Sequence, residues 1–347
     1  MKIYYIANVR LPTEKAHGIQ IMKTCEALVD LGNDVELVVT DRYTPIEENA
    51  FDYYDARKNF RLLKLRCLDV VDFGWLGFWI TTVSFMARVT RYSLFKTGIF
   101  YTRDEFVAFC LKLIGKKVVW EAHMGQRNIF VRFLIRMKIP VVVISQGLKD
   151  LYLSMGMDED KIMIAHDGVD LEKFNIKSSK FDARAKLNLD KNQKFVVYTG
   201  SDQPGKGVDI LEKAQNFLPE GIRVIIVSNK PHQEIPLYLQ AADILVLPNS
   251  SKNEMSRLFT SPMKLFEYMA SGVPIIASRV PSLQEVLTEK TALFFEPDDP
   301  KGIVTAVHDT LSDPASAFSR AKQAQVEVVQ YTWKKRAEII LTVLSNA

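Results

Sequence analysis

Residues 259–278, FTSPMKLFEYMASGVPIIAS, predict a loop, a helix and a short strand in direct succession. Thr260 and Ser261 are hydroxyl residues of the kind that cap helices, and the fixed φ of Pro262 suits a first helical turn. Apolar residues then recur at helical spacing until Gly272, a typical helix stop, and an apolar strand follows. Such a helix start presents free backbone N–H groups and a positive dipole end, which together favour an anion.

Two charged residues lie on this predicted helix, Lys264 in its first turn and Glu267 one turn later. A cation near a helix N-terminus opposes the helix dipole, so we expect Lys264 to serve a ligand rather than the helix. Taken alone, the stretch also fits an ordinary amphipathic helix with a solvated lysine and glutamate. The rest of the chain has to decide between these two interpretations.

The stretch resembles the donor-binding signature of retaining glycosyltransferases with the GT-B fold, glycosyltransferase family 4. The resemblance implies that the helix start, Ser261, Pro262 and Met263, together with Lys264, binds the diphosphate of a nucleotide sugar. It also implies that Glu267 binds the ribose hydroxyls. The nucleotide-diphosphate sugar would be a co-substrate, and no cofactor is implied.

Composition is that of a folded protein with two domains. The 347 residues are 48% hydrophobic and 25% charged, with a net charge of +4. Three widely spaced cysteines without a CxxC motif favour reduced thiols in a cytoplasmic protein over a zinc module. Met1 leads directly into a strand pattern, which leaves no room for a signal peptide. The longest nearly uncharged run, Phe73–Ala87, is shorter than the roughly 18–20 residues that span a bilayer.

Short apolar segments alternate with helical segments along the whole chain, which predicts α/β architecture with two doubly wound parallel sheets. We assign residues 1–170 to a first Rossmann-like, acceptor-side domain and residues 171–330 to a second, donor-binding domain, with a cleft between them. Residues 331–347 are expected to form a helix that crosses back to the first domain, as in GT-B enzymes. A linker and a first helix are expected over Asn175–Lys194. The predicted strands are Ile3–Ala7, Val35–Thr40, Arg61–Leu65, Ile99–Tyr101, Val118–Trp120, Val141–Ile144, Ile162–Ala165, Phe195–Thr199, Arg223–Val227, Ile244–Leu247, Ile275–Ala277 and Leu293–Phe295.

A glycine-rich loop, GSDQPGKG at Gly200–Gly207, follows the first strand of the second domain. Backbone in such a loop can approach a phosphate closely, and a lysine in it can neutralise charge. The loop resembles the family's phosphate loop, in which Lys206 matches the diphosphate lysine. Ser201 stands where the family has an arginine, and its loss should weaken phosphate binding unless Lys264 or Arg257 compensates.

Two positions in the first domain match the family's active site. Gly18, in a loop after the first strand, matches a glycine that contacts the donor, although an ordinary loop glycine fits equally well. His123 lies at the carboxyl end of a predicted strand, where ligands of open α/β sheets gather, and is the candidate catalytic residue. We interpret His17 as a solvated loop residue and Glu121 as a residue that orients the loop.

The sequence departs from the family at two further points. Phe259 stands where the family has a glutamate that contacts the donor sugar. The segment 228–234 is shorter than in relatives, where it helps to frame the nucleotide base. We interpret His232 in this segment as an exposed loop residue.

No convincing metal site or nucleic-acid platform is expected. Asp298-Asp299 and Asp158-Glu159-Asp160 lie among turn residues, and we interpret both groups as surface turns. The basic residues lack the aromatic interleaving of a nucleic-acid surface.

The order of the motifs predicts a retaining glycosyltransferase that moves a sugar from a nucleotide sugar to a hydroxyl of a glycan or lipid-linked sugar acceptor. The implied setting is bacterial-type envelope polysaccharide or glycoconjugate synthesis. Two alternatives stay open: another GT-B nucleotide-sugar enzyme, such as an epimerase or a phosphorylase, or a non-catalytic nucleotide-sugar-binding protein.

Residues 73–138 carry 11 Lys/Arg against 3 Asp/Glu, and several aromatic residues lie among them. Tryptophan beside arginine suits a helix that lies in the headgroup region of an anionic membrane. This interpretation implies a cytoplasmic enzyme that is peripheral on the inner face of the cell membrane. The alternative is that the aromatic residues are ordinary protein core and that only the basic ends are solvated.

Overall fold

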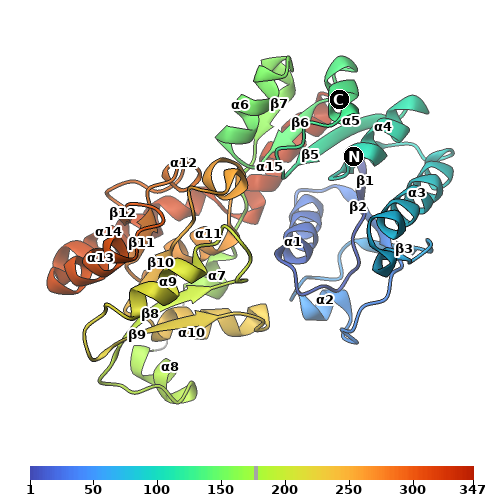
Figure 1. Ribbon diagram of the computed structural model, residues 1–347. Coiled ribbons are helices and arrows are strands. Elements are labelled where there is room, and N and C mark those ends of the chain that lie inside the picture. Colours follow the sequence, from blue (N-terminus) through green and yellow to red (C-terminus); the bar gives the residue numbers. More distant parts are fainter. Residues whose placement is uncertain (176–178) are drawn as a thin grey trace. The chain divides into compact units, whose positions relative to one another are not determined.

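Each half of the chain is built on one parallel β-sheet, as the ribbon diagram of this computed structural model shows (Figure 1). The structure describes residues 1–175 and 179–347. The predicted fold class, two parallel α/β units, is confirmed. Unit 1 comprises Met1–Ile144, Leu148–His166 and Trp333–Ala347, and unit 2 comprises Ser145–Gly147 and Asp167–Thr332.

The sheet of unit 1 has the strand order β3-β2-β1-β4-β5-β6-β7, and every neighbouring pair is parallel. The order reverses between β1 and β4, so the loops that follow these two strands diverge at the carboxyl edge of the sheet. All seven strands predicted for this half are present. They are β1 (Lys2–Ala7), β2 (Asp34–Thr40), β3 (Arg61–Leu65), β4 (Ile99–Thr102), β5 (Lys117–Ala122), β6 (Val141–Val143) and β7 (Ile162–Ile164).

Helices cover both faces of this sheet. Tyr5 of β1 belongs to the core shared with α1 and α15, whereas its neighbour Tyr4 stacks on Phe100 and meets the edge of Tyr92 in α3. Adjacent strand residues point to opposite faces, so α3 covers the face opposite α1. The helices are α1 (Ala16–Asp30), α2 (Ala50–Tyr53), α3 (Gly74–Ser93), α4 (Glu105–Leu113), α5 (Ile129–Arg136), α6 (Gln146–Ser154) and α15 (Trp333–Ser345), with short turns η1 (Val71–Phe73) and η2 (Glu159–Lys161).

The terminal helix α15 is joined to unit 1 by a buried ion pair as well as by apolar packing. Arg336 pairs with the buried carboxylate of Glu121 at the end of β5. Its guanidinium also donates to the carbonyl oxygens of Ala165 and, at 2.8 Å, of His166. One cation therefore holds the last helix, strand β5 and the segment after β7 together.

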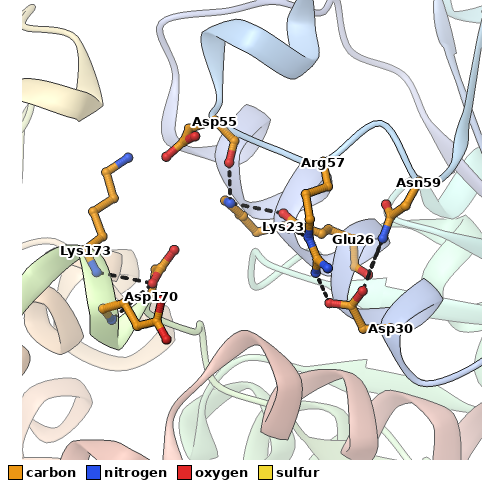
Figure 2. A network of polar contacts seen from close by, with 9 residues as sticks. Lys23, Glu26, Asp30, Asp55, Arg57, Asn59, Asp170 and Lys173 are labelled. Atoms are coloured by element: carbon orange, nitrogen blue, oxygen red, sulfur yellow. Dashed lines mark hydrogen bonds and ion pairs between the residues drawn. The ribbon is translucent and has the colours of Figure 1, made fainter.

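A polar network fastens the segment after α2 to the outer surface of α1 (Figure 2). Arg57 donates to Glu26 at 2.7 Å and also pairs with Asp30, while Asn59 donates to Asp30 at 3.2 Å. Lys23 donates to the second oxygen of Glu26 at 3.0 Å. The Arg57–Asp30 pair is exposed and contributes little to stability, whereas the carboxylate of Glu26 is buried and is paired with both Lys23 and Arg57.

Unit 2 has a five-stranded parallel sheet of order β12-β11-β10-β8-β9, with β9 at one edge. The five strands predicted for this half are also present: β8 (Lys194–Thr199), β9 (Ile222–Val227), β10 (Ile244–Leu247), β11 (Ile275–Ser278) and β12 (Leu293–Phe295). Its helices are α7 (Leu171–Phe174), α8 (Lys180–Lys186), α9 (Val208–Gln215), α10 (Ile235–Ala241), α11 (Met263–Ser271), α12 (Pro281–Gln284), α13 (Pro300–Ser312) and α14 (Pro314–Glu327), with short turns η3 (His232–Glu234), η4 (Met255–Phe259) and η5 (Val328–Gln330).

The linker and helix expected over Asn175–Lys194 are described only in part. Residues 176–178 of that stretch lie outside the described residues. The helix is α8, which begins with a capping box in which Ser179 and Asp182 bond each other's backbone N–H groups. Buried Arg184 of α8 donates to Asp243 at 2.6 Å and so ties this helix to the start of β10.

We predict that replacing Arg336 destabilises unit 1. Arg336→Met leaves the Glu121 carboxylate buried without its guanidinium partner, and breaking a buried pair in this way costs about 3–5 kcal/mol. The measurement is the free energy of unfolding from urea titration. Lys334→Ala, an exposed cation two residues earlier on the same helix, is the matched control and should unfold like the wild type. Equal stability of the Arg336 and Lys334 variants would contradict the assignment.

Candidate functional site

The start of α11 has no side-chain cap, contrary to the sequence prediction. Pro262 occupies the N-cap position and the helix begins at Met263, so the hydroxyls of Thr260 and Ser261 do not cap it. Ser261 instead accepts a hydrogen bond from the Asp167 backbone N–H at 3.2 Å. Because proline has no N–H and its side chain cannot cap, the first backbone N–H groups of α11 are left for a ligand. Gly272 ends the helix in the left-handed conformation, as predicted.

Lys264 points from α11 to the glycine-rich loop. Its ammonium lies 3.7 Å from the centre of the Tyr198 ring, a cation–π contact. A Cβ on Gly200 would come within 2.5 Å of the Lys264 Nζ, and Gly200 has φ +127°, so glycine is required there on both counts. Lys264 thus stands beside the loop in which Ser201 replaces the family's arginine.

Lys206 lies close enough to Lys264 to lower the pKa of the Lys264 ammonium. The pKa of Lys264 is held well below its ordinary value by burial and by the proximity of Lys206, whereas Glu267 acts in the opposite direction. Burial also lowers the pKa of Lys206. Neither ammonium has an ion-pair partner among the described residues. Two partly buried ammonium groups without ion-pair partners would be stabilised by an anion between or beside them.

Glu267, the predicted ribose ligand, is buried on α11 and contacts His232. The His232 Nε2 lies 2.7 Å from Glu267 Oε1, and the His232 ring packs at 5.5 Å on Phe174. The interpretation of His232 as an exposed loop residue is therefore wrong, since its side chain is only 20% exposed. The short connection after β9 brings it to Glu267, a pairing across 35 residues that no local pattern in the sequence indicates.

Phe259 is buried, with 4% exposure, so an ionised glutamate at this position would require a charge in the core. Asp298 accepts hydrogen bonds from the hydroxyls of Ser250 and Ser251, and Asp299 caps α13. Both aspartates are structural turn residues, as interpreted.

His123 follows β5 in unit 1 and lies beside Glu121. The two side chains approach to 2.9 Å, and Glu121 also accepts a 2.5 Å hydrogen bond from Tyr5. Burial, reinforced by nearby Arg103, lowers the pKa of His123 to about 3, so its imidazole is neutral at neutral pH. Burial opposes ionisation of Glu121, but His123 and Arg336 hold the pKa of its carboxyl below the ordinary range. Glu121, which the sequence predicted to orient the loop, thus contacts His123 and also binds the terminal helix.

Arg103 is a candidate site residue that the sequence analysis missed. It follows β4, as Asn8 follows β1 and His123 follows β5, and these three strands are neighbours in the sheet. Arg103 Nη1 and Asn8 Oδ1 are buried polar atoms without hydrogen-bond partners among the described residues. Unsatisfied buried groups are costly, so their presence at a strand-end edge marks a ligand site. The strand-end rule that selected His123 would also have selected Arg103.

Local packing requires a residue without a side chain at Gly18. It lies in the first turn of α1, where a Cβ would come within 2.0 Å of the Tyr54 hydroxyl oxygen. That hydroxyl donates to the Thr13 carbonyl oxygen at 2.7 Å and accepts from the Thr13 backbone N–H at 2.6 Å. Gly18 and Tyr54 therefore shape the loop after β1. Burial, then Arg103, lowers the pKa of His17 to about 4, so His17 is not the solvated residue expected.

We predict that the stability of unit 1 decreases with acidification. The folded-state pKa values of His17, about 4, and His123, about 3, lie below the unfolded value of about 6.5. Below pH 6.5 the unfolded chain therefore binds protons that the folded chain does not, and each histidine lowers the stability by up to about 1.4 kcal/mol per pH unit until its folded pKa is reached. Urea midpoints at pH 7.5 and 5.0 measure the decrease.

His17→Gln should reduce this pH dependence, whereas His308→Gln, at an exposed position in unit 2, should not. A pH dependence unchanged by His17→Gln would show that its imidazole is protonated alike in the folded and unfolded chains.

Part of the chain matches a known protein family. Residues 175–313 match the family Glycosyl transferases group 1. The Arabidopsis thaliana sulfoquinovosyl transferase SQD2 is 24% identical over 231 residues, which cover 59% of this chain and 44% of that protein. The chain thus spans about half the length of the curated relatives that it matches.

Solved structures share the fold over the whole chain. HepE from Anabaena, in complex with UDP and glucose, superposes with a TM-score of 0.79 at 14% identity and covers all of both chains. WaaG, a glycosyltransferase involved in lipopolysaccharide biosynthesis, superposes with a TM-score of 0.69 at 12% identity over 99% of this chain and all of its own. Residues 175–313 therefore resemble the glycosyltransferases of group 1, and the chain as a whole has the GT-B fold of two parallel α/β units.

Proposed function

We propose that the chain is a retaining glycosyltransferase that takes its sugar from a nucleotide-diphosphate sugar. The observation that carries this proposal is the pair of partly buried lysines, Lys206 and Lys264, beside the uncapped start of α11. Ammonium groups and free N–H groups in one place match a diphosphate, which brings several negative oxygens at once. The HepE complex, which contains UDP and glucose, is consistent with this class of ligand.

Glu267 would bind the ribose of the donor. Its Oε1 is engaged by His232, which leaves Oε2 to accept hydrogen bonds from the ribose hydroxyls. His232 in turn would keep the carboxylate in one orientation and pre-organise it for the nucleotide. Ser261, Pro262 and Met263 would contribute the helix start that faces the diphosphate.

Charge stabilisation of the leaving group would be the main catalytic contribution. As the bond between sugar and phosphate breaks, negative charge develops on the diphosphate, and Lys206 and Lys264 are placed to stabilise it. We propose that these cations make a bound metal unnecessary. The acceptor hydroxyl would attack from the face that the diphosphate leaves, and the leaving phosphate would take its proton, so no protein nucleophile is required.

At the carboxyl edge of the unit 1 sheet, His123 would act as a neutral hydrogen-bonding group towards the reacting sugar. Arg103 and Asn8 supply polar atoms that need partners at the same edge, which suits a ligand rich in hydroxyl or phosphate oxygens. Gly18 would keep the neighbouring loop close enough to contact the donor. We propose a glycan or lipid-linked sugar of envelope polysaccharide or glycoconjugate synthesis as the acceptor. The similarity in fold to WaaG is consistent with this choice.

We predict that Lys206→Ala, Lys264→Ala and Glu267→Gln each weaken binding of a nucleoside diphosphate. Losing one charge-assisted contact should cost about 1.5–3 kcal/mol, a decrease in affinity of roughly 10- to 100-fold. Calorimetric titration with UDP, GDP and ADP measures the affinities and identifies the base. Lys213→Ala, an exposed lysine on α9, is the matched control and should bind like the wild type. Wild-type affinity in both the Lys206 and Lys264 variants would rule out the phosphate site.

We predict that the new glycosidic bond has the same anomeric configuration as the donor. The reaction, run on a panel of sugar acceptors in excess EDTA, should proceed because the lysines rather than a metal stabilise the diphosphate. The measurement is the anomeric coupling constant of the isolated product by NMR. Inversion at the anomeric carbon would contradict the retaining mechanism, and loss of transfer that magnesium or manganese restores would contradict metal independence.

A further inference from the structure

Helix α3 carries its large apolar residues on the solvent side, the reverse of an ordinary surface helix. Its buried positions are Gly77, Thr81, Thr82, Phe85, Val89 and Ser93, most of them small or hydroxyl residues. The Thr81 hydroxyl accepts a hydrogen bond from the Val70 N–H, so polar contacts help to hold the buried face. The exposed large residues of its first half are Trp75, Leu76, Phe78, Trp79, Ile80 and Val83, with Trp75 73% and Val83 56% exposed.

This exposed face extends across the two neighbouring helices of unit 1. Trp79 of α3 meets the edge of Phe106 in α4 at 5.1 Å, and Phe106 meets the edge of Phe130 in α5 at 4.5 Å. Phe133 of α5 is partly exposed and joins the same chain of rings through Phe109. In Figure 1, α3 and α4 lie beside each other in unit 1. We call this surface the aromatic face; it consists of the exposed side chains of Trp75, Leu76, Phe78, Trp79, Ile80 and Val83 in α3 and of Phe133 in α5.

Exposed cations lie on the same three helices: Arg88 and Arg91 on α3, Lys112 on α4, and Arg132 and Arg136 on α5. None of the five forms an ion pair with another described residue. The only carboxylates on these helices and their N-caps are Glu105, which is buried, and Asp104, which caps α4. The nearest exposed carboxylate in sequence is Asp72, just before α3.

A hollow at the C-terminal end of α3 brings arginines and apolar side chains together. Its volume is about 350 Å³, and Arg66, Arg88 and Arg91 line it together with Leu94 and Phe95. Phe95 is 93% exposed. Arg66 lies 4.0 Å from Asp41, whereas Arg88 and Arg91 have no ion-pair partner among the described residues, so these two arginines match a phosphate. The apolar rim matches the first methylene groups of an acyl chain.

We propose that the aromatic face and the arginine hollow form a docking surface for anionic phospholipid. Tryptophan and phenylalanine would enter the boundary between headgroups and acyl chains, and the five cations would contact lipid phosphates. Among the described residues, no helix is both long and apolar enough to cross a bilayer, so the contact is a shallow one. This proposal does not depend on the transfer reaction, because the surface and its charges are read from unit 1 alone.

Charge decides between a lipid surface and a second copy of the chain. A two-fold dimer through this face would place the same five cations of each copy against those of the other, with no exposed carboxylates of the three helices to offset them. An anionic bilayer instead offers negative phosphates beside an apolar layer. Both the charge and the apolar character of the surface are then matched.

The test is co-sedimentation of the full chain with vesicles of phosphatidylcholine alone and with 30% phosphatidylglycerol, a probe composition of about one anionic lipid in three. We expect binding to the anionic vesicles only. It should be largely reversed in 1 M salt, where the screening length falls from about 10 Å at 0.1 M to about 3 Å. Trp75→Ser/Ile80→Ser should reduce the bound fraction about tenfold, and Arg88→Ala/Arg91→Ala should reduce it similarly.

Matched controls lie in unit 2. Phe318→Ser removes an equally exposed aromatic ring, and Lys290→Ala/Lys301→Ala removes two exposed cations; both should bind vesicles like the wild type. All variants replace exposed side chains, and their thermal unfolding is measured to confirm that the fold is kept. The proposal is overturned if wild type stays in the supernatant with anionic vesicles, or if the Trp75/Ile80 variant binds them equally well. A dimer in light scattering that this variant converts to monomer would overturn it too.

Discussion

The buried carboxylate of Glu121 is the interaction on which the arrangement of unit 1 depends. It lies at the end of β5 and makes close contacts with Tyr5, His123 and Arg336, which come from the first strand, the adjacent loop and the last helix. A buried charge is tolerated only when such partners neutralise it. The ion pair therefore closes the unit around its terminal helix and at the same time fixes His123 at the sheet edge where a ligand would bind.

The candidate site of unit 2 follows the opposite principle, because its two ammonium groups have no ion-pair partners among the described residues. Lys206 and Lys264 lie in one partly buried site, and the nearest carboxylate, Glu267, is held by His232. The cost of such an arrangement would be recovered if an anion bound, and this is the physical reason for proposing a phosphate site here. The same unsatisfied character recurs in unit 1 at Arg103, so each unit carries polar groups that await a ligand.

The fold and most of the site could be predicted because they rest on local patterns. Alternating apolar runs predicted all twelve strands that the sheets contain, and the motif around residues 260–272 placed Lys264 and Glu267 on a helix. The resemblance to the glycosyltransferase family also rested on these motifs, and the match over residues 175–313 confirmed it. Local hydrogen-bond geometry was less predictable, since Ser261 bonds the Asp167 N–H instead of capping the helix that follows it.

What the sequence by itself determined is therefore the order of strands and helices and the position of the candidate phosphate-binding motif, because periodicity and turn chemistry act over a few residues. Only the tertiary structure decided which distant groups meet. The pairing of His232 with Glu267 spans 35 residues, and that of Arg336 with Glu121 spans 215. It also decided that the apolar half of α3 is exposed: its composition fits a core helix equally well, and burial depends on what the rest of the chain packs against it.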